Sequence, residues 1–120
     1  MKTLTDLQQI TDVPVVIANH QGFVTYINSR FTEVLGWGEA EIIGELITKI
    51  LPKNFQDSHT LAFSRFQATE RATVLNHPIQ LATVTKEHGE IETEHFIVAE
   101  KRGEQWLFGA MLTPIAESIA

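Results

Sequence analysis

The chain has 120 residues, of which 43% are hydrophobic and 20% are charged, a composition typical of one globular domain rather than of a disordered segment. Nine scattered basic residues against 15 acidic ones give a formal net charge of −6, which argues against binding to nucleic acid or to anionic lipid. Because cysteine is absent, disulfides, thiolate metal sites, cysteine nucleophiles and thiol-linked chromophores are excluded. No apolar run approaches a membrane span and the N-terminus lacks a signal-peptide core, so we expect a cytoplasmic domain.

The first part of the chain predicts a short helix followed by a β-hairpin. The helix covers about residues 3–10, where three aliphatic residues recur near helical spacing: Leu4, Leu7 and Ile10. Two short runs rich in β-forming residues follow, at 13–18 and 23–28. The polar turn between them ends at Gly22, a residue able to adopt positive φ, so these runs are expected to pair as a hairpin.

Helical periodicity dominates the middle of the chain. Asn28 ends the second strand at a point where its amide can bond to local backbone groups. A helix is expected from Ser29, with Gly36 placed to end it. Short helical turns follow as far as Pro52, which cannot continue a helix, and a longer helix is predicted over 54–69.

Three β-rich segments complete the chain, at 79–85, 91–100 and 106–115. Gly89 centres the turn between the first two of these segments, and the sequence KRGEQ makes the next turn. The order is therefore two strands, several short helices and three strands. This order predicts an α+β domain in which an antiparallel sheet carries helices on one face.

The order of elements, and the sequences within it, resemble the PAS sensory family. Three segments carry the resemblance: VIANHQGFVTYINSRFTEVLGWGEAEIIGE, LPKNFQDSH and KEHGEIE. The resemblance implies a five-stranded antiparallel sheet flanked by short helices, with a central pocket and a role in signalling rather than catalysis. The PAS domain is then expected over 13–115, preceded by a flanking helix over 1–12 and followed by the start of a connector at 116–120.

One face of the longer predicted helix combines a histidine with apolar residues. His59 shares that face with Ala62, Phe63 and Phe66, and a buried imidazole needs a partner for its ring nitrogens. Within the PAS family, this helix is most similar to that of heme-binding oxygen sensors. The resemblance implies that His59 is the proximal iron ligand of a b-type heme and that Arg65 lies near a heme propionate.

The same resemblance points to residues on the distal side of such a heme. Gln80 occupies the position of the distal arginine of oxygen-sensing members, and His77 lies near the place of a distal methionine ligand. Both depart from the family pattern, so the sensed gas stays open. A His59 that is satisfied by protein groups, without heme, is the alternative. The candidate cofactor-binding residues are therefore His59, Phe63, Arg65, Phe66, His77 and Gln80, with His59 as the candidate metal ligand.

Other chemistry is not expected from this sequence. No serine–histidine–acid set or phosphate-binding glycine loop is recognisable, so we expect no enzyme activity, and the five histidines lack the paired spacing of a zinc site. The expected function is a sensory input module that binds a small ligand or cofactor and signals through homodimer geometry to the effector domain of a longer protein. A heme sensor of gas or redox state is the alternative. The N-terminal helix is expected either to join the dimer contact or to cap its own core.

Overall fold

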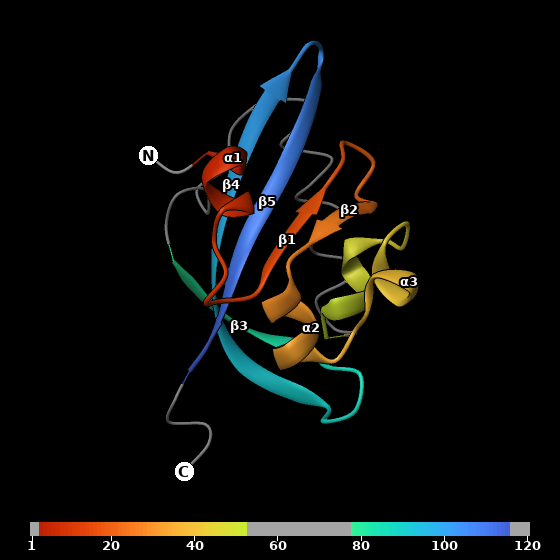
Figure 1. Cartoon of the computed structure of the whole chain (residues 1–120), viewed down its shortest axis with the longest axis vertical. Coiled ribbons are helices and arrows are strands. Elements are labelled where there is room, and N and C mark those ends of the chain that lie inside the picture. Colours follow the sequence, from red (N-terminus) through yellow and green to blue (C-terminus); the bar gives the residue numbers. More distant parts are fainter. Residues whose placement is uncertain (1–2, 53–77, 116–120) are drawn as a thin grey trace.

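A five-stranded antiparallel sheet organises the fold (Figure 1). In the computed structural model, which describes residues 3–52 and 78–115, the strands lie in the order β2-β1-β5-β4-β3. Their bounds are Val15–Ala18 for β1, Val24–Ile27 for β2, Ile79–Val84 for β3, Glu90–Arg102 for β4 and Gln105–Pro114 for β5. Because β1 pairs with β5, strands from opposite ends of the sequence meet in the middle of the sheet. The predicted α+β fold is confirmed.

The last two strands form a longer hairpin than the sequence predicts. Arg102 pairs with Gln105, so that only Gly103 and Glu104 make the turn. Gly103 adopts a φ of 65°, in the left-handed region that favours glycine. In Figure 1 this hairpin projects past the neighbouring strands at the top of the view.

Four short helical segments accompany the sheet within the described residues. They are α1 (Leu4–Gln8), α2 (Ser29–Leu35), α3 (Glu39–Ile42) and the 3₁₀ turn η1 (Ile47–Ile50). A capping box between Thr3 and Asp6 begins α1, and Gly36 at a φ of 87° ends α2 as predicted. The longer helix predicted over 54–69 lies outside the described residues. No described helix has the length and apolar character needed to cross a membrane.

The sheet buries apolar side chains on both of its faces. On the inner face, which α2, α3 and η1 cover, the core consists of Val16, Val24, Ile27, Phe31, Leu35, Ile42, Ile50 and Leu112. On the outer face, which carries α1, it consists of Leu4, Leu7, Val15, Ile17 and Val98. Successive residues of β1 therefore alternate between two cores, which explains why this strand is apolar throughout.

Helix α1 is seated on the outer face of its own sheet. Leu4 and Leu7 are fully buried there, and the backbone N–H of Leu4 donates to a carboxylate oxygen of Glu100 over 3.0 Å. The seat requires Gly109, since a Cβ at this position would lie 2.6 Å from Leu4 Cδ2 and 2.7 Å from Leu7 Cδ1. The structure thus favours the capping alternative for this helix. Leu4 and Leu7 are buried within the chain, so their side chains are not available for a contact with a second copy.

Asn28 ties together the segments on either side of the first hairpin. Its Oδ1 accepts from the backbone N–H groups of Val15 and Phe31 at 3.0 and 2.9 Å. Its Nδ2 donates to the carbonyl oxygens of Ile10 and Val13 at 3.0 and 2.8 Å. One buried amide therefore caps α2 and also fixes the path of the chain between α1 and β1.

Candidate functional site

Three polar side chains lie buried together on the inner face of the sheet. Thr83 belongs to β3, whereas Thr93 and His95 belong to β4, and their exposed fractions are 0%, 0% and 4%. His95 pairs with Leu112 of the inner core, which places the imidazole on this face, and the strand alternation places Thr93 there too. We call these residues the Thr–Thr–His cluster.

The cluster is held by short hydrogen bonds. Thr83 Oγ1 lies 2.7 Å from Thr93 Oγ1 and 3.0 Å from His95 Nε2, and Thr93 Oγ1 lies 2.9 Å from the same ring nitrogen. The hydroxyl of Thr93 also donates to the carbonyl oxygen of Leu81. In the described part of the chain, no buried side-chain nitrogen or oxygen lacks a hydrogen-bond partner. Burial of this polar group is therefore compatible with a stable core.

Among the described residues, apolar side chains neighbour the cluster on the inner face. Ile91, which pairs with Thr83, and Ala110 both pack against the inner core, and Leu112 belongs to it. A few polar groups set into an apolar wall are the usual composition of a small-molecule site in proteins. The cluster is therefore the strongest candidate site in the described residues.

A second set of contacts holds the inner-face helices to the β3–β4 hairpin that carries the cluster. The indole N–H of Trp37 donates to the carbonyl oxygen of Val84 over 3.1 Å. The backbone N–H of Lys86 donates to the carbonyl oxygen of Leu35 over 2.9 Å, and the ammonium of Lys86 forms an ion pair with Glu41. These contacts fix the helical wall relative to β3 and β4.

Neighbouring groups shift the pKa values of both members of this ion pair. The backbone N–H of Gly38, which donates to Glu41 Oε1 over 2.9 Å, holds the pKa of Glu41 below its usual range, and the Lys86 ammonium lowers it further. In turn, the hydrogen bond to Glu41 raises the pKa of Lys86. The contribution of Glu41 to stability is therefore present above the ordinary carboxyl pKa and is lost as the pH falls through the lowered value. The contribution of Lys86 to stability is lost as the pH rises through its raised pKa.

Glu41→Gln is expected to lower the melting temperature modestly at neutral pH, because the pair is exposed and screened by solvent. The difference from the unmodified chain should vanish in acid, where Glu41 is protonated in both states. Glu33→Gln, which removes an exposed i,i+3 pair with Arg30, is the matched control and should change little at any pH. Thermal unfolding followed by circular dichroism across a pH series measures both. A Glu41→Gln effect of equal size in acid and at neutral pH would contradict the assignment.

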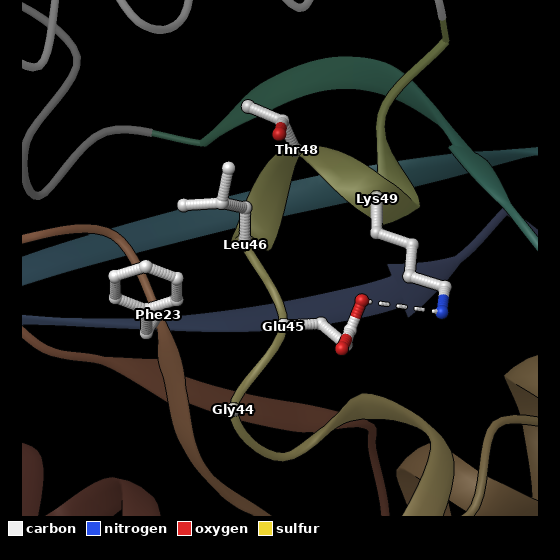
Figure 2. A pocket seen from close by; sticks show the side chains of 6 residues that line it. All are labelled: Phe23, Gly44, Glu45, Leu46, Thr48 and Lys49. Atoms are coloured by element: carbon white, nitrogen blue, oxygen red, sulfur yellow. Dashed lines mark ion pairs between the residues drawn. The ribbon is translucent and has the colours of Figure 1, made fainter.

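Figure 2 shows a shallow surface depression that is a weaker candidate. Phe23 and Leu46, which are 38% and 48% exposed, pair across a single β-bridge beside it. Glu45 and Lys49 form an ion pair over 3.6 Å at its margin. The residues that line it are Phe23, Gly44, Glu45, Leu46, Thr48 and Lys49. This depression is open to solvent and its one ion pair is satisfied within itself, so it offers no convergent polar groups to a ligand.

The candidate residues predicted from the sequence are not brought together in the described part of the chain. Gln80 is exposed and pairs with the exposed Glu94, so it lies on the outer face of β3, opposite to the Thr–Thr–His cluster. The other five candidates lie outside the described residues: His59, Phe63, Arg65, Phe66 and His77. Within 3–52 and 78–115, no group of three or more His, Cys, Asp or Glu side chains is placed to hold a metal ion.

The cluster itself was not predicted from the sequence. Both alternating sets of positions in 91–100 contain apolar residues, so periodicity alone does not show which way His95 faces. The sequence does contain one indication of the cluster. Among the alternate positions that share a strand face, the polar residues Thr93 and His95 stand between Ile91 and Ile97. A polar pair between two β-branched apolar residues on one strand face indicates buried polar groups with partners on the next strand.

Comparison with known proteins agrees with this architecture. The family model described as the PAS fold matches residues 4–99, and the chain belongs to the PAS family. None of the curated proteins compared with the chain matches it.

Solved structures of PAS domains share the fold at low sequence identity. The PAS domain of a Desulfitobacterium hafniense protein is 18% identical with a TM-score of 0.71, covering 92% of this chain and 99% of its own. The PAS domain of an HTR-like protein from Haloarcula marismortui is 15% identical with a TM-score of 0.73, covering 93% of this chain and 88% of its own. The Cronobacter turicensis RpfR quorum-sensing receptor PAS domain, solved in complex with C12:0, is 16% identical with a TM-score of 0.67. The alignment covers 89% of this chain and 97% of that domain.

Proposed function

We propose that this PAS domain is a sensory input module that binds a small molecule against the inner face of its sheet. The ligand has an apolar body and a polar head group, and the head group meets the Thr–Thr–His cluster. The observation that carries this proposal is the complete burial of Thr83 and Thr93 with His95 within an apolar wall. Such a group provides orientation and specificity, while the aliphatic side chains provide affinity.

The solved relatives support this class of ligand. The RpfR PAS domain has been solved in complex with C12:0, and it shares the fold of this chain over most of both lengths. At 16% identity this likeness extends to the fold, and the choice of ligand rests on the residues of this chain.

Signal transmission is proposed to use the strands that the two faces share. His95 of β4 faces the inner core, while its neighbour Phe96 packs on the outer core beneath α1. If β4 can take two positions and the ligand binds them with different affinity, the ligand shifts the equilibrium between them. That shift would move the outer-face surface on which α1 packs. The output is then a change in the geometry of a homodimer that is read by an effector domain of a longer protein.

Titration of isotope-labelled protein with 1-octanol and, separately, with octanoate tests the site, using amide correlation spectra. At least one of the two is expected to produce saturable shifts that centre on Thr83, Thr93 and His95. The matched variants are Thr83→Val, which removes a buried hydroxyl, and Thr25→Val, which removes the hydroxyl of an exposed residue that donates to the carbonyl oxygen of Ile17. Affinity should fall in the first variant and stay unchanged in the second. Shifts confined to the surface depression, or equal affinity in both variants, would contradict the proposed site.

Heme binding through His59 is the alternative function, and it has its own readout. The one buried histidine among the described residues, His95, does not fit as an iron ligand because its Nε2 is engaged by two hydroxyl oxygens. If the domain senses a small molecule without heme, we expect no Soret band after expression with an ample heme supply. A Soret band that disappears in His59→Ala would instead establish the heme sensor.

A further inference from the structure

The Thr–Thr–His cluster contains a hydrogen-bond chain whose direction can be counted from its protons. Thr93 has one hydroxyl proton, and it is committed to the carbonyl oxygen of Leu81. Thr93 Oγ1 must therefore accept in its other two contacts. Thr83 has one hydroxyl proton for its contact with Thr93 at 2.7 Å and for its contact with His95 Nε2 at 3.0 Å.

The tautomer of His95 follows from this count. If Nε2 carried a lone pair, one proton from Thr83 would have to serve all three short contacts, and Nε2 would face Thr93 Oγ1 over 2.9 Å with no proton between them. If Nε2 carries the proton, it donates to the two hydroxyl oxygens and Thr83 donates to Thr93 Oγ1. Every contact then contains a proton, so this tautomer is the one the geometry favours.

The same count determines what the cluster offers to a ligand. In this arrangement the two hydroxyl protons and the Nε2 proton are all used inside the cluster. Each hydroxyl oxygen has two lone pairs, and those of Thr93 Oγ1 are taken by Thr83 and by Nε2. Thr83 Oγ1 accepts only from Nε2 within the cluster and keeps one lone pair. Thr83 Oγ1 therefore keeps acceptor capacity, and neither hydroxyl keeps donor capacity.

We infer that His95, as the Nε2–H tautomer, sets the site to select ligands whose head group donates a hydrogen bond to Thr83 Oγ1. The ligand class is a neutral molecule with an apolar body and a hydroxyl, amide N–H or protonated acid at its head. A carboxylate or phosphate head is rejected, because burying an anion against acceptor oxygens without a donor is unfavourable. This inference rests on the proposed function, since it names the class of ligand for the same site.

The tautomer is tested by long-range ¹H–¹⁵N correlation of the histidine rings, with the ring of His95 identified from His95→Gln. The expected result at neutral pH is a protonated Nε2. A proton on Nδ1 with an unprotonated Nε2 would overturn the inference and leave the proposed ligand site standing. This measurement requires no ligand, so it separates the two proposals.

The ligand class is tested with three probes that share an eight-carbon chain: 1-octanol, methyl octanoate and octanoate. Only 1-octanol donates a hydrogen bond, so it is expected to bind about tenfold more tightly than the ester, and octanoate is expected to bind least. Thr83→Val should abolish the preference for the alcohol, whereas Thr83→Ser should keep it. In Thr83→Val the Nε2 proton still has Thr93 Oγ1 as an acceptor, so the variant is expected to fold.

The outcomes distinguish the two proposals. Octanoate binding as tightly as 1-octanol, or a preference for the alcohol that survives in Thr83→Val, would overturn the inference while ligand binding itself stands. Failure of all three probes to bind would overturn the proposed function, and the ligand class with it.

Discussion

Asn28→Ala is expected to destabilise the domain by about 3 kcal/mol, because the side chain satisfies four backbone groups at once. Alanine leaves the N–H groups of Val15 and Phe31 without their buried acceptor, and each unsatisfied buried group is costly. It also removes the cap of α2. Urea unfolding followed by fluorescence of the two tryptophans measures the loss.

Two further substitutions determine whether the network is the cause. Asn28→Asp keeps the two acceptor bonds but points a carboxylate at the carbonyl oxygens of Ile10 and Val13, so it should also destabilise strongly. Asn19→Ala removes two bonds from a turn amide whose contacts are exposed, and about 1 kcal/mol or less is expected there. Equal losses for Asn28→Ala and Asn19→Ala would show that burial of the network contributes nothing.

Leu7→Ala is the second large effect that we expect. Leu7 is completely buried between α1 and the outer face, and truncating such a leucine typically costs about 2–4 kcal/mol. Since α1 lies at one end of the described chain, the loss should appear as faster hydrogen exchange in the amides of α1 and of the β5 segment beneath it. The inner-face strand β3 should keep its protection. Uniformly faster exchange over both faces would contradict the assignment of separate cores.

Gly109→Ala tests the packing of α1 against the outer face by a substitution in β5. Its Cβ would lie within 2.7 Å of both Leu4 and Leu7, so overpacking should destabilise the seat by about 1–3 kcal/mol. In the Leu7→Ala background one of these clashes is gone, so Gly109→Ala should cost less there. Additive effects in the double variant would show that the two residues do not contact each other.

The sequence was sufficient to predict most of the fold because its local signals agree with the tertiary structure. Gly22 and Gly36 take the positive φ values that their positions indicate, and Asn28 bonds to the backbone as expected. The local patterns predicted the chain order of the strands and their antiparallel arrangement, and the resemblance to the PAS family added that one sheet contains five strands. The order β2-β1-β5-β4-β3 within that sheet was not predicted. The length of the β4–β5 hairpin was underestimated, because the charged residues beside Gly103 suggested a longer turn although they pair across the ladder.

The position of α1 and the candidate site were harder to predict for a physical reason. The pattern of Leu4 and Leu7 shows that one face of α1 is buried, but not whether the burying surface belongs to the same chain. The decisive feature is Gly109, a hundred residues away in sequence, where the missing side chain makes room for the helix. Such complementarity between distant segments has no local signature.

The Thr–Thr–His cluster shows the same difficulty within the sheet. Thr83 and Thr93 belong to different strands, and only the pairing of β3 with β4 brings their hydroxyls within 2.7 Å. The pairing with Leu112 is what identifies the buried side of His95. The sequence drew attention instead to His59, where a helical pattern concentrates a histidine and aromatic residues within a few positions. That candidate stays a prediction, since it lies outside the described residues.

Above all, we propose that the Thr–Thr–His cluster contacts the ligand of the domain. The most direct measurement is the ¹⁵N chemical shift of the His95 ring nitrogens during titration with 1-octanol. We predict a saturable change that is lost in Thr83→Val and retained in Thr83→Ser. A His95 ring signal that stays constant while 1-octanol binds elsewhere in the domain would contradict the claim.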